Sequence, residues 1–172
     1  MTSPSGKFTC TVCGNSHVGA PTDSAFTLPD LVWELSLEER VERARWTTDL
    51  CRMDDLHFIR CLLEIPFTDQ PGYYGWGVWV QIEGKDLRKY LEFYDKDGTA
   101  EPPISGTLAN ELPTYGSTLG MPLLVQFRTA SERPAIEFAD GNAHPLAREA
   151  KIGMSYGRFH EVLLARGLKS GL

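Results

Sequence analysis

The sequence predicts an α+β domain in which an antiparallel sheet is packed on one face by helices, with an N-terminal arm that resembles a zinc knuckle. The centre of the chain alternates as half-buried strands do. Helical patterns lie between the strands and at the C-terminal end. The strands follow one another too closely for regular βαβ crossovers, which favours antiparallel pairing. With 172 residues, the chain is long enough to bury one core of its own.

The N-terminal segment has little apolar sequence. Residues 1–7 are predicted to be a disordered tail, and residues 8–168 are predicted to form a single domain. Within it, residues 8–25 are rich in Cys, Gly, Ser, Thr and Pro. This composition predicts a compact knuckle-like arm that packs on the core. Residues 26–35 are expected to be extended and are interrupted by Pro29.

Ser36 opens the first clear helix. Glu39 stands three residues later, which is the capping-box pattern. Leu37, Val41 and Ala44 share one face of this helix. The sequence therefore predicts an amphipathic helix just before the strands of the central region.

Two central segments show the clearest strand pattern. Residues 57–65 alternate, with the odd-numbered side chains facing the core, and Pro66 ends the pattern. Residues 75–83 alternate in the same way, with Trp76 and Val78 on the core face. The remaining expected elements are a helix over 87–94, strands over 104–109, 121–128 and 133–139, and a helix over 155–166 that ends at Gly167.

Charge and hydropathy exclude several classes of function. The net charge of −6 and the isoelectric point near 5.2 argue against a general phosphate-binding surface, so nucleic acid is not an expected partner. No apolar run approaches the roughly 20 residues that cross a bilayer, and residues 1–7 lack the apolar core of a signal peptide. We therefore expect a cytoplasmic protein with no membrane partner. In that compartment its four cysteines are expected to serve metal or redox chemistry rather than disulfides.

The strongest chemical signal is the segment Phe8-Thr-Cys10-Thr-Val-Cys13-Gly-Asn-Ser-His17. Two thiolates separated by two residues can turn onto one tetrahedral ion, and the following glycine permits a tight turn. We interpret the segment as half of a zinc site. The alternatives are a thioredoxin-like dithiol, which normally follows a strand and opens a helix, and a pair of unrelated surface thiols.

The zinc site needs ligands from elsewhere in the chain. Cys51 is the best third thiolate because it lies in a polar stretch between the first helix and the first strand. His17, four residues after Cys13, is the expected fourth ligand, and His57 is its rival. Cys61 is set aside because its parity places it on the apolar face of a strand, where a free cysteine acts as a small hydrophobe. A shell of three cysteines and one histidine is closed, so the zinc is expected to be structural and to tie the arm to the loop around Cys51.

Trp79 and Arg60 mark a candidate partner-binding face. Trp79 points away from the core, on the face that it shares with Gly75 and Gly77. Two interpretations are open: a stacking platform for a partner, or a side chain that covers bare backbone beneath another element. The face opposite the core is either simply solvated or a binding or active-site face. Five further side chains are expected to share this face with Arg60: Glu64, Gln81, Gln126, Arg128 and Glu137.

No catalytic motif accompanies these residues. His144 precedes a helical segment and is either a general base or a capping residue. The sequence contains no phosphate-binding glycine loop, nucleophile elbow, metalloprotease helix or dinucleotide fingerprint. These observations favour a non-enzymatic protein-binding or accessory module with a structural zinc. The alternative is a metal-assisted hydrolase, or another small-molecule enzyme, that uses the face around Arg60, Trp79 and His144.

Several short stretches, each weakly specific alone, form a pattern that covers nearly the whole chain. They are Cys10-Thr-Val-Cys13-Gly with His17, Asp49-Leu-Cys51, His57-Phe-Ile-Arg60, Leu63-Glu-Ile-Pro66, Trp76-Gly-Val-Trp79-Val, Ser105-Gly106 before Leu108, Tyr115 with Leu119, Arg133-Pro134 and His144-Pro-Leu-Ala147. This pattern resembles domain of unknown function 2199, a bacterial family of uncharacterised proteins. The family pattern favours a glycine at the position of Cys61, which supports setting that cysteine aside. The resemblance implies a small, soluble, stand-alone bacterial domain without an established activity, and its matched positions include the expected metal ligands Cys10, Cys13, His17 and Cys51.

Overall fold

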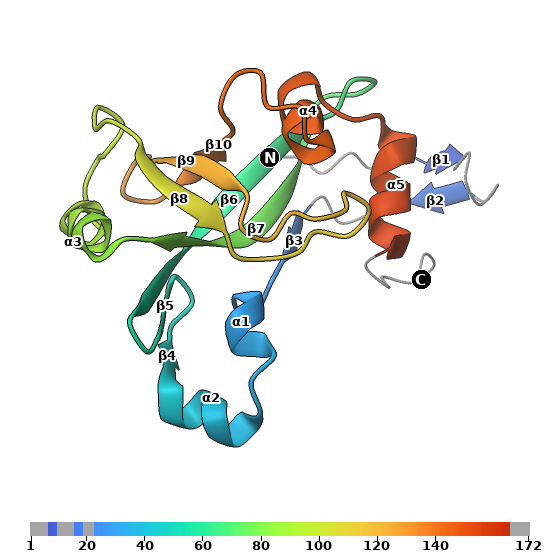
Figure 1. Ribbon diagram of the computed structural model, residues 1–172. Coiled ribbons are helices and arrows are strands. Elements are labelled where there is room, and N and C mark those ends of the chain that lie inside the picture. Colours follow the sequence, from blue (N-terminus) through green and yellow to red (C-terminus); the bar gives the residue numbers. More distant parts are fainter. Residues whose placement is uncertain (1–6, 10–15, 19–22, 166–172) are drawn as a thin grey trace.

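The computed structural model describes residues 7–9, 16–18 and 23–165 of the chain (Figure 1). Eight of the described strands hydrogen-bond in the order β3-β7-β8-β9-β10-β6-β5-β4, and β6 also pairs with β7, so β6 to β10 close into a five-stranded barrel. The strands are β1 (Lys7–Thr9), β2 (Ser16–Val18), β3 (Asp23–Ala25), β4 (Ala44–Trp46), β5 (Leu50–Met53), β6 (Leu56–Pro66), β7 (Tyr73–Ile82), β8 (Ile104–Leu108), β9 (Pro122–Gln126) and β10 (Ala135–Glu137). The helices are α1 (Asp30–Trp33), α2 (Leu37–Arg43), α3 (Gly84–Phe93), α4 (Pro145–Ile152) and α5 (Tyr156–Ala165).

The barrel is built on the long β6–β7 hairpin. Its antiparallel register runs from His57 opposite Ile82 to Pro66 opposite Tyr73. The odd-numbered residues of β6 and the even-numbered residues of β7 form the core face, as the alternation predicts. The buried side chains that these two strands contribute to the main core are Ile59, Cys61, Leu63, Ile65, Tyr74, Trp76, Val78, Val80 and Ile82.

The predicted α+β class is confirmed, and most strand pairs of the sheet are antiparallel, but the sheet closes into a barrel and two of its described strand pairs are parallel. β10 pairs with β6 in parallel, with Ala135 opposite Leu62, and β3 pairs with β7 in parallel, with Ser24 opposite Trp76. Figure 1 shows α3, α4 and α5 at different places around the barrel. Closure of the barrel protects strand edges that an open sheet would leave exposed. Local alternation does not report which distant strands pair, so the closure was not predictable from it.

The C-terminal helix covers one part of the barrel, as its sequence predicts. Ser155 precedes α5, and its hydroxyl accepts a hydrogen bond from the Arg158 amide at 3.1 Å. Phe159 of α5 packs its ring 4.8 Å from the ring of Tyr74 and 5.4 Å from that of Phe67. Among the helices of the described residues, none has the length and the apolar character needed to cross a membrane.

A lobe built from α1, α2 and β4 projects from the barrel, and we call residues 30–46 the α1–β4 lobe (Figure 1). The predicted capping box is present: the Ser36 hydroxyl accepts from the Glu39 amide (3.2 Å), and the Glu39 carboxylate accepts from the Ser36 amide (3.1 Å). α2 itself buries no side chain. A second apolar cluster joins the lobe to the barrel: Leu28, Val32, Ala44, Cys51, Met53, Phe58, Trp79 and Ala109.

The predicted N-terminal arm is described only at three short strands, β1, β2 and β3. β1 pairs with β2 in antiparallel fashion, with Phe8 opposite His17. In Figure 1 this pair lies on the same side of the view as α5, whereas β5 lies at the opposite side. Cys10 and Cys13 lie outside the described residues.

Candidate functional site

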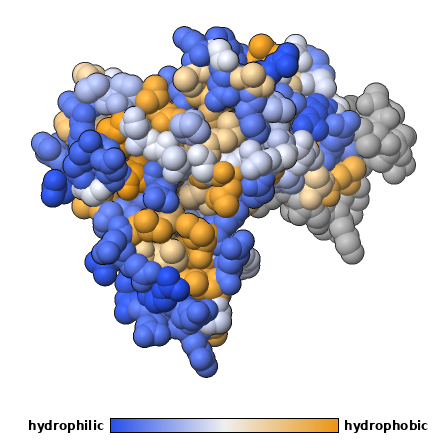
Figure 2. Space-filling view, in the orientation of Figure 1, coloured by the Kyte–Doolittle hydropathy of each residue, from blue (hydrophilic) through white to orange (hydrophobic). Residues whose placement is uncertain are grey.

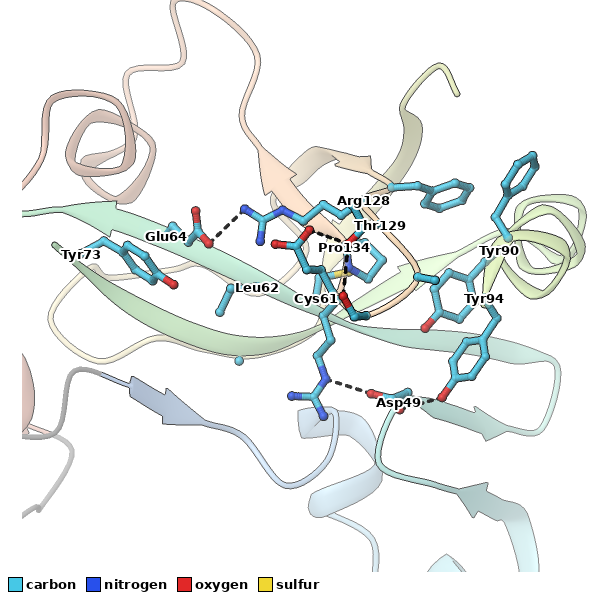
Figure 3. Close-up of a pocket in the computed structure, with 17 residues that line it drawn as sticks. Asp49, Cys61, Leu62, Glu64, Tyr73, Tyr90, Tyr94, Arg128, Thr129 and Pro134 are labelled. Atoms are coloured by element: carbon cyan, nitrogen blue, oxygen red, sulfur yellow. Dashed lines mark hydrogen bonds and ion pairs between the residues drawn. The ribbon is translucent and has the colours of Figure 1, made fainter. Parts of the chain in front are cut away.

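A cleft of about 570 Å³ opens between β6, α3 and residues 127–134, which we call the arch (Figure 3). The alternation of β6 turns Leu62 and Glu64 away from the barrel interior, and both line the cleft. Tyr90 of α3 and Tyr94, which follows this helix, line it from another side. The volume lies within the roughly 300–1,000 Å³ that is typical of small-molecule sites.

Two ion pairs fasten the arch across the cleft. Arg128 Nη2 lies 3.0 Å from Glu64 Oε1, and Arg133 Nε donates to Asp49 Oδ1 at 2.8 Å. The hydroxyl of Tyr94 donates to the other oxygen of Asp49 at 2.9 Å. Asp49 precedes β5, so a single carboxylate holds together the base of β5, the end of α3 and the arch (Figure 3).

These contacts determine the electrostatics at Asp49. Burial alone would raise the pKa of its carboxyl, but hydrogen bonds from Arg133, Tyr94 and Thr48 together hold it below its ordinary value. Arg60 belongs to the same group of charges. Burial lowers the pKa of its guanidinium, the positive charge of Arg133 lowers it further, and Asp49 opposes both effects. Both guanidinium groups thus lie within electrostatic range of Asp49, but only that of Arg133 is hydrogen-bonded to it.

Arg60 and Trp79 pair in register on the outer face, but another part of the chain covers them. The Arg60 guanidinium lies 5.0 Å from the centre of the Trp79 ring. Trp79 is completely buried, its Nε1 donates to the Phe26 carbonyl oxygen (3.1 Å), and Arg60 Nη2 donates to the same oxygen. A Cβ at Gly77 would lie 3.0 Å from the Cβ of Ala25, so β3 lies directly against this glycine. In this structure Trp79 covers backbone beneath β3 and the segment after it, and it presents no exposed ring to a partner.

The other members of the predicted outer face are only partly brought together. Glu64 and Arg128 form the ion pair of the cleft. Gln126 turns elsewhere, with its side-chain amide donating to the carbonyl of Glu101 at 3.1 Å. The structure therefore replaces the predicted single face with a cleft that uses two of these side chains.

His144 is a capping residue at the start of α4. Its Nδ1 accepts from the Leu146 amide at 3.1 Å, so Nε2 carries the proton and donates to the Ser117 carbonyl at 2.9 Å. Neither contact involves Arg60 or Trp79. The three residues of the predicted enzyme alternative are therefore not assembled into one site.

The predicted zinc ligands are not brought together within the described residues. His17 lies in β2, and Cys51 lies in β5 rather than in a polar loop, because β4 and β5 pair as a short hairpin. Burial of the Cys51 thiol in the second apolar cluster raises its pKa to about 11. In the described part of the chain, no group of three His, Cys, Asp or Glu side chains could hold a metal ion. The zinc site stays a prediction, and a ligand role for Cys51 would require its thiol to leave this cluster.

Cys61 and His57, which the sequence ranks below Cys51 and His17 as zinc ligands, also lie within the described residues. Cys61 is completely buried in the barrel, and burial raises the pKa of its thiol. This position is that of a small hydrophobe. His57 lies near the start of β6, opposite Ile82 and close to Gly84 at the beginning of α3.

Sequence reasoning missed an exposed apolar surface on the α1–β4 lobe. Leu37 and Val41 of α2 are 73% and 60% exposed, and Trp33 of α1 is 58% exposed. Figure 2 shows apolar side chains gathered over the lobe with hydrophilic ones around them. The signal was present in the shared helix face of Leu37 and Val41, but such a pattern does not say what covers the face. We call the exposed set the lobe patch: Leu31, Trp33, Leu37, Val41 and Trp46.

Comparison with known proteins places the chain in one family. No curated protein and no solved structure matches it. A family model described as an uncharacterized protein conserved in bacteria (DUF2199) matches residues 9–154, a span that includes the lobe patch and the cleft. The chain therefore belongs to the DUF2199 family of uncharacterized bacterial proteins, which is the family that its short motifs resemble.

Proposed function

We propose that the protein is a protein-binding module and that the lobe patch is its docking surface. The observation that carries the proposal is that α2 has an apolar face and yet buries no side chain. Monomeric proteins rarely leave apolar surfaces of this kind together and uncovered, and those that remain mark interaction sites. The docking surface therefore lies on the lobe rather than at Trp79, which is buried.

The lobe patch is held in place before any partner arrives. Arg40 of α2 donates from Nε to the Val32 carbonyl (3.0 Å) and from Nη2 to the carbonyls of Trp33 (2.5 Å) and Leu35 (3.1 Å). Its guanidinium also lies 5.0 Å from the centre of the Trp33 ring. One side chain from α2 thus satisfies three carbonyls at the end of α1. A surface that is already ordered loses little entropy on binding.

The charge around the patch indicates the chemistry of the partner. Residues 30–55 carry eight acidic and four basic side chains. The three arginines of the lobe bond to carbonyls within it or to Asp54, whereas Glu38 and Glu42 form no ion pair with a described residue. The outward field of the lobe is therefore negative. The partner is a protein segment in which apolar side chains are flanked by Lys and Arg.

Two synthetic amphipathic helices with the same leucine face are suitable probes, one with lysine and one with glutamate on the polar face. We expect calorimetry to show saturable binding of the lysine peptide that weakens as salt is raised, and no binding of the glutamate peptide. The double variant Leu37→Gln/Val41→Gln removes two apolar contacts and is expected to weaken binding by about ten-fold or more.

Ile152 provides the matched control because it is an equally exposed apolar side chain, 68% exposed, on α4 outside the lobe. Ile152→Gln is expected to bind the lysine peptide as the unmodified chain does. Equal weakening in this control, or no saturable binding at all, would overturn the proposal. Self-association that the double variant abolishes in sedimentation velocity would also overturn it, because the occupant would then be a second copy of the chain.

We further propose that Cys10 and Cys13 hold a structural zinc ion in the N-terminal arm, with His17 and Cys51 as the remaining ligands. The Cys-x-x-Cys-Gly spacing supports the proposal. The pairing of β1 with β2 also supports it, because these strands flank both cysteines. A closed shell of this kind stabilises a fold and leaves no position for a substrate.

Metal content tests this part of the proposal. On protein purified without added zinc, plasma mass spectrometry is expected to find about one zinc per chain, lost in Cys10→Ala together with thermal stability. Cys51→Ala tests the third thiolate, since retained zinc would remove Cys51 from the site. Cys61→Ala is the control and is expected to keep its zinc. Unmodified protein without metal would overturn the zinc proposal and leave the docking proposal unaffected.

A further inference from the structure

The cleft in Figure 3 has the features of a small-molecule site and is separate from the lobe patch. Its volume of about 570 Å³ accommodates a ligand of modest size. Ion-paired side chains from β6, the arch and the turn before β5 line part of it. The rest of its lining includes an unusual number of aromatic side chains: Tyr73, Tyr90, Phe93, Tyr94 and Phe127.

The arginines of the cleft retain unused donors. Arg133 bonds to Asp49 through Nε alone, and Arg128 bonds to Glu64 through Nη2 alone. A guanidinium has five N–H donors, so most donors of these two groups are not used by the described residues. The Arg133 side chain is 47% exposed and thus accessible.

The central acid of the cleft is, by contrast, fully engaged. Asp49 accepts hydrogen bonds from Arg133, Tyr94 and Thr48 at 2.8, 2.9 and 3.2 Å. The cleft is lined by two arginines, Arg128 and Arg133, and by three acids, Asp49, Glu64 and Glu132, each of which already accepts a hydrogen bond or an ion pair. A carboxylate ligand would therefore be attracted by the unused guanidinium donors and not by a net positive charge. The planar fork of a guanidinium matches a carboxylate, with two parallel hydrogen bonds. The aromatic lining favours a flat ring beside that group.

We propose that the cleft binds a small aromatic carboxylic acid, with its carboxylate held by Arg133 and Arg128 and its ring against the aromatic side chains. Asp49 then competes with the ligand for Arg133. Removal of the Asp49 charge is therefore expected to strengthen binding, an effect that general damage to the fold would not produce.

Benzoate, acetate and benzamide are the probes, since they separate the contributions of charge and ring. We expect benzoate to bind saturably in ligand-observed NMR, with a dissociation constant of about 1 mM, as suits so small a ligand. Acetate lacks the ring and benzamide lacks the charge, so both are expected to bind more weakly. Equal binding of acetate would overturn the aromatic class of the ligand, and equal binding of benzamide would overturn the role of the arginines.

Three variants assign the contacts. Arg133→Gln and Arg128→Gln are each expected to weaken benzoate binding by about ten-fold, because each loses a charge-assisted hydrogen bond. Asp49→Asn is expected to strengthen it by about five-fold. Arg45→Gln, a change on the lobe, is the control and is expected to leave binding unchanged.

The proposal requires benzoate binding to weaken in the arginine variants and to strengthen in Asp49→Asn. Thermal unfolding of each variant is measured in parallel, so that a change of affinity is assigned only to folded protein. No saturable benzoate binding up to about 20 mM would overturn the proposal. A weakening in Asp49→Asn as large as that in Arg133→Gln would do so too, because it would show that the cleft needs its ion pair rather than its free donors.

Discussion

The barrel buries its patterned apolar side chains, whereas the α1–β4 lobe leaves apolar side chains exposed. Leu63 of β6 and Leu37 of α2 both belong to regular apolar patterns, yet Leu63 is buried in the barrel and Leu37 is largely exposed. In the barrel, strands that are distant in sequence close over the apolar face. In the lobe, no described segment closes over α2. The burial of an apolar side chain is thus decided by what packs on it, and the lobe leaves its apolar side chains uncovered.

The largest predicted effect tests this contrast with one substitution at two places. Leu63→Ala removes a fully packed side chain from the barrel and is expected to lower the free energy of unfolding by about 2–5 kcal/mol. Leu37→Ala changes an exposed position and is expected to alter it by less than about 0.5 kcal/mol. Urea denaturation at neutral pH measures both. A cost at Leu37 close to that at Leu63 would mean that the lobe patch is covered in solution, and it would break the comparison.

A second prediction compares Gly→Ala substitutions at two glycines that differ in the free space around a new Cβ atom. A Cβ at Gly106 of β8 would lie 2.5 Å from Val80 Cγ1 and 2.9 Å from the Gln81 carbonyl oxygen. Gly106→Ala is therefore expected to cost about 1–3 kcal/mol of stability. Gly84→Ala, at the start of α3, meets nothing closer than 3.8 Å and is expected to stabilise the protein by about 0.4–1 kcal/mol. If Gly106→Ala and Gly84→Ala shift the thermal unfolding midpoint in the same direction, the space around these glycines does not determine the effect.

Local patterns predicted individual elements well. The alternation over residues 57–65 lies within β6, and Pro66 is the last residue of that strand, as expected. The capping signal at Ser36 is realised in the hydrogen bonds of α2. His144 caps α4, which was one of the two roles considered for it. Each of these features depends on residues within a few positions of one another, which is the range over which periodicity and end signals are informative.

Long-range pairing explains most of what could not be predicted. The parity of Trp79 correctly placed it on the face opposite to that of Trp76. Its ring is buried all the same, because β3 returns to pair with β7 and Phe26 follows directly after β3. Cys51 was expected in a loop, but it lies in β5, which has only four residues and follows the three-residue β4, and both strands are too short for alternation to show. The cleft depends on Arg133 reaching Asp49 across 84 positions of sequence. No local pattern specifies such a contact.

A third prediction concerns how independently the lobe opens. Ser36→Ala removes the cap of a helix that buries nothing, so its cost of about 1 kcal/mol is expected to appear as local opening, with exchange of α2 amides faster by about five-fold. Ser155→Ala removes the cap of α5, which buries five side chains. Its amides are expected to exchange only with global unfolding. Hydrogen exchange followed by NMR separates the two cases. If α2 amides exchange at the same rate as barrel amides, the lobe does not open independently of the barrel.

The smallest predicted effect lies where the two regions meet. Asp49, in the turn between β4 and β5, holds the base of the lobe to the arch through Arg133. Burial would raise the pKa of Asp49, but its hydrogen bonds lower it in the folded protein. A carboxyl with a depressed pKa contributes stability above its unfolded value of about 3.9, and this contribution is lost as the pH falls through the folded value.

Stability is therefore expected to fall as the pH drops below about 4, and part of that fall is expected to disappear in Arg133→Gln, which removes the strongest of the lowering contacts. Urea midpoints between about pH 2 and pH 7 measure the two slopes, with Arg45→Gln as a control that removes an arginine bound only to carbonyls of the lobe. If Arg133→Gln and Arg45→Gln follow parallel curves, the Asp49 contact does not couple the lobe to the barrel. If the Arg133→Gln curve is flatter, the ionised Asp49 carboxylate stabilises the fold through Arg133, and the lobe and the barrel are joined at Asp49.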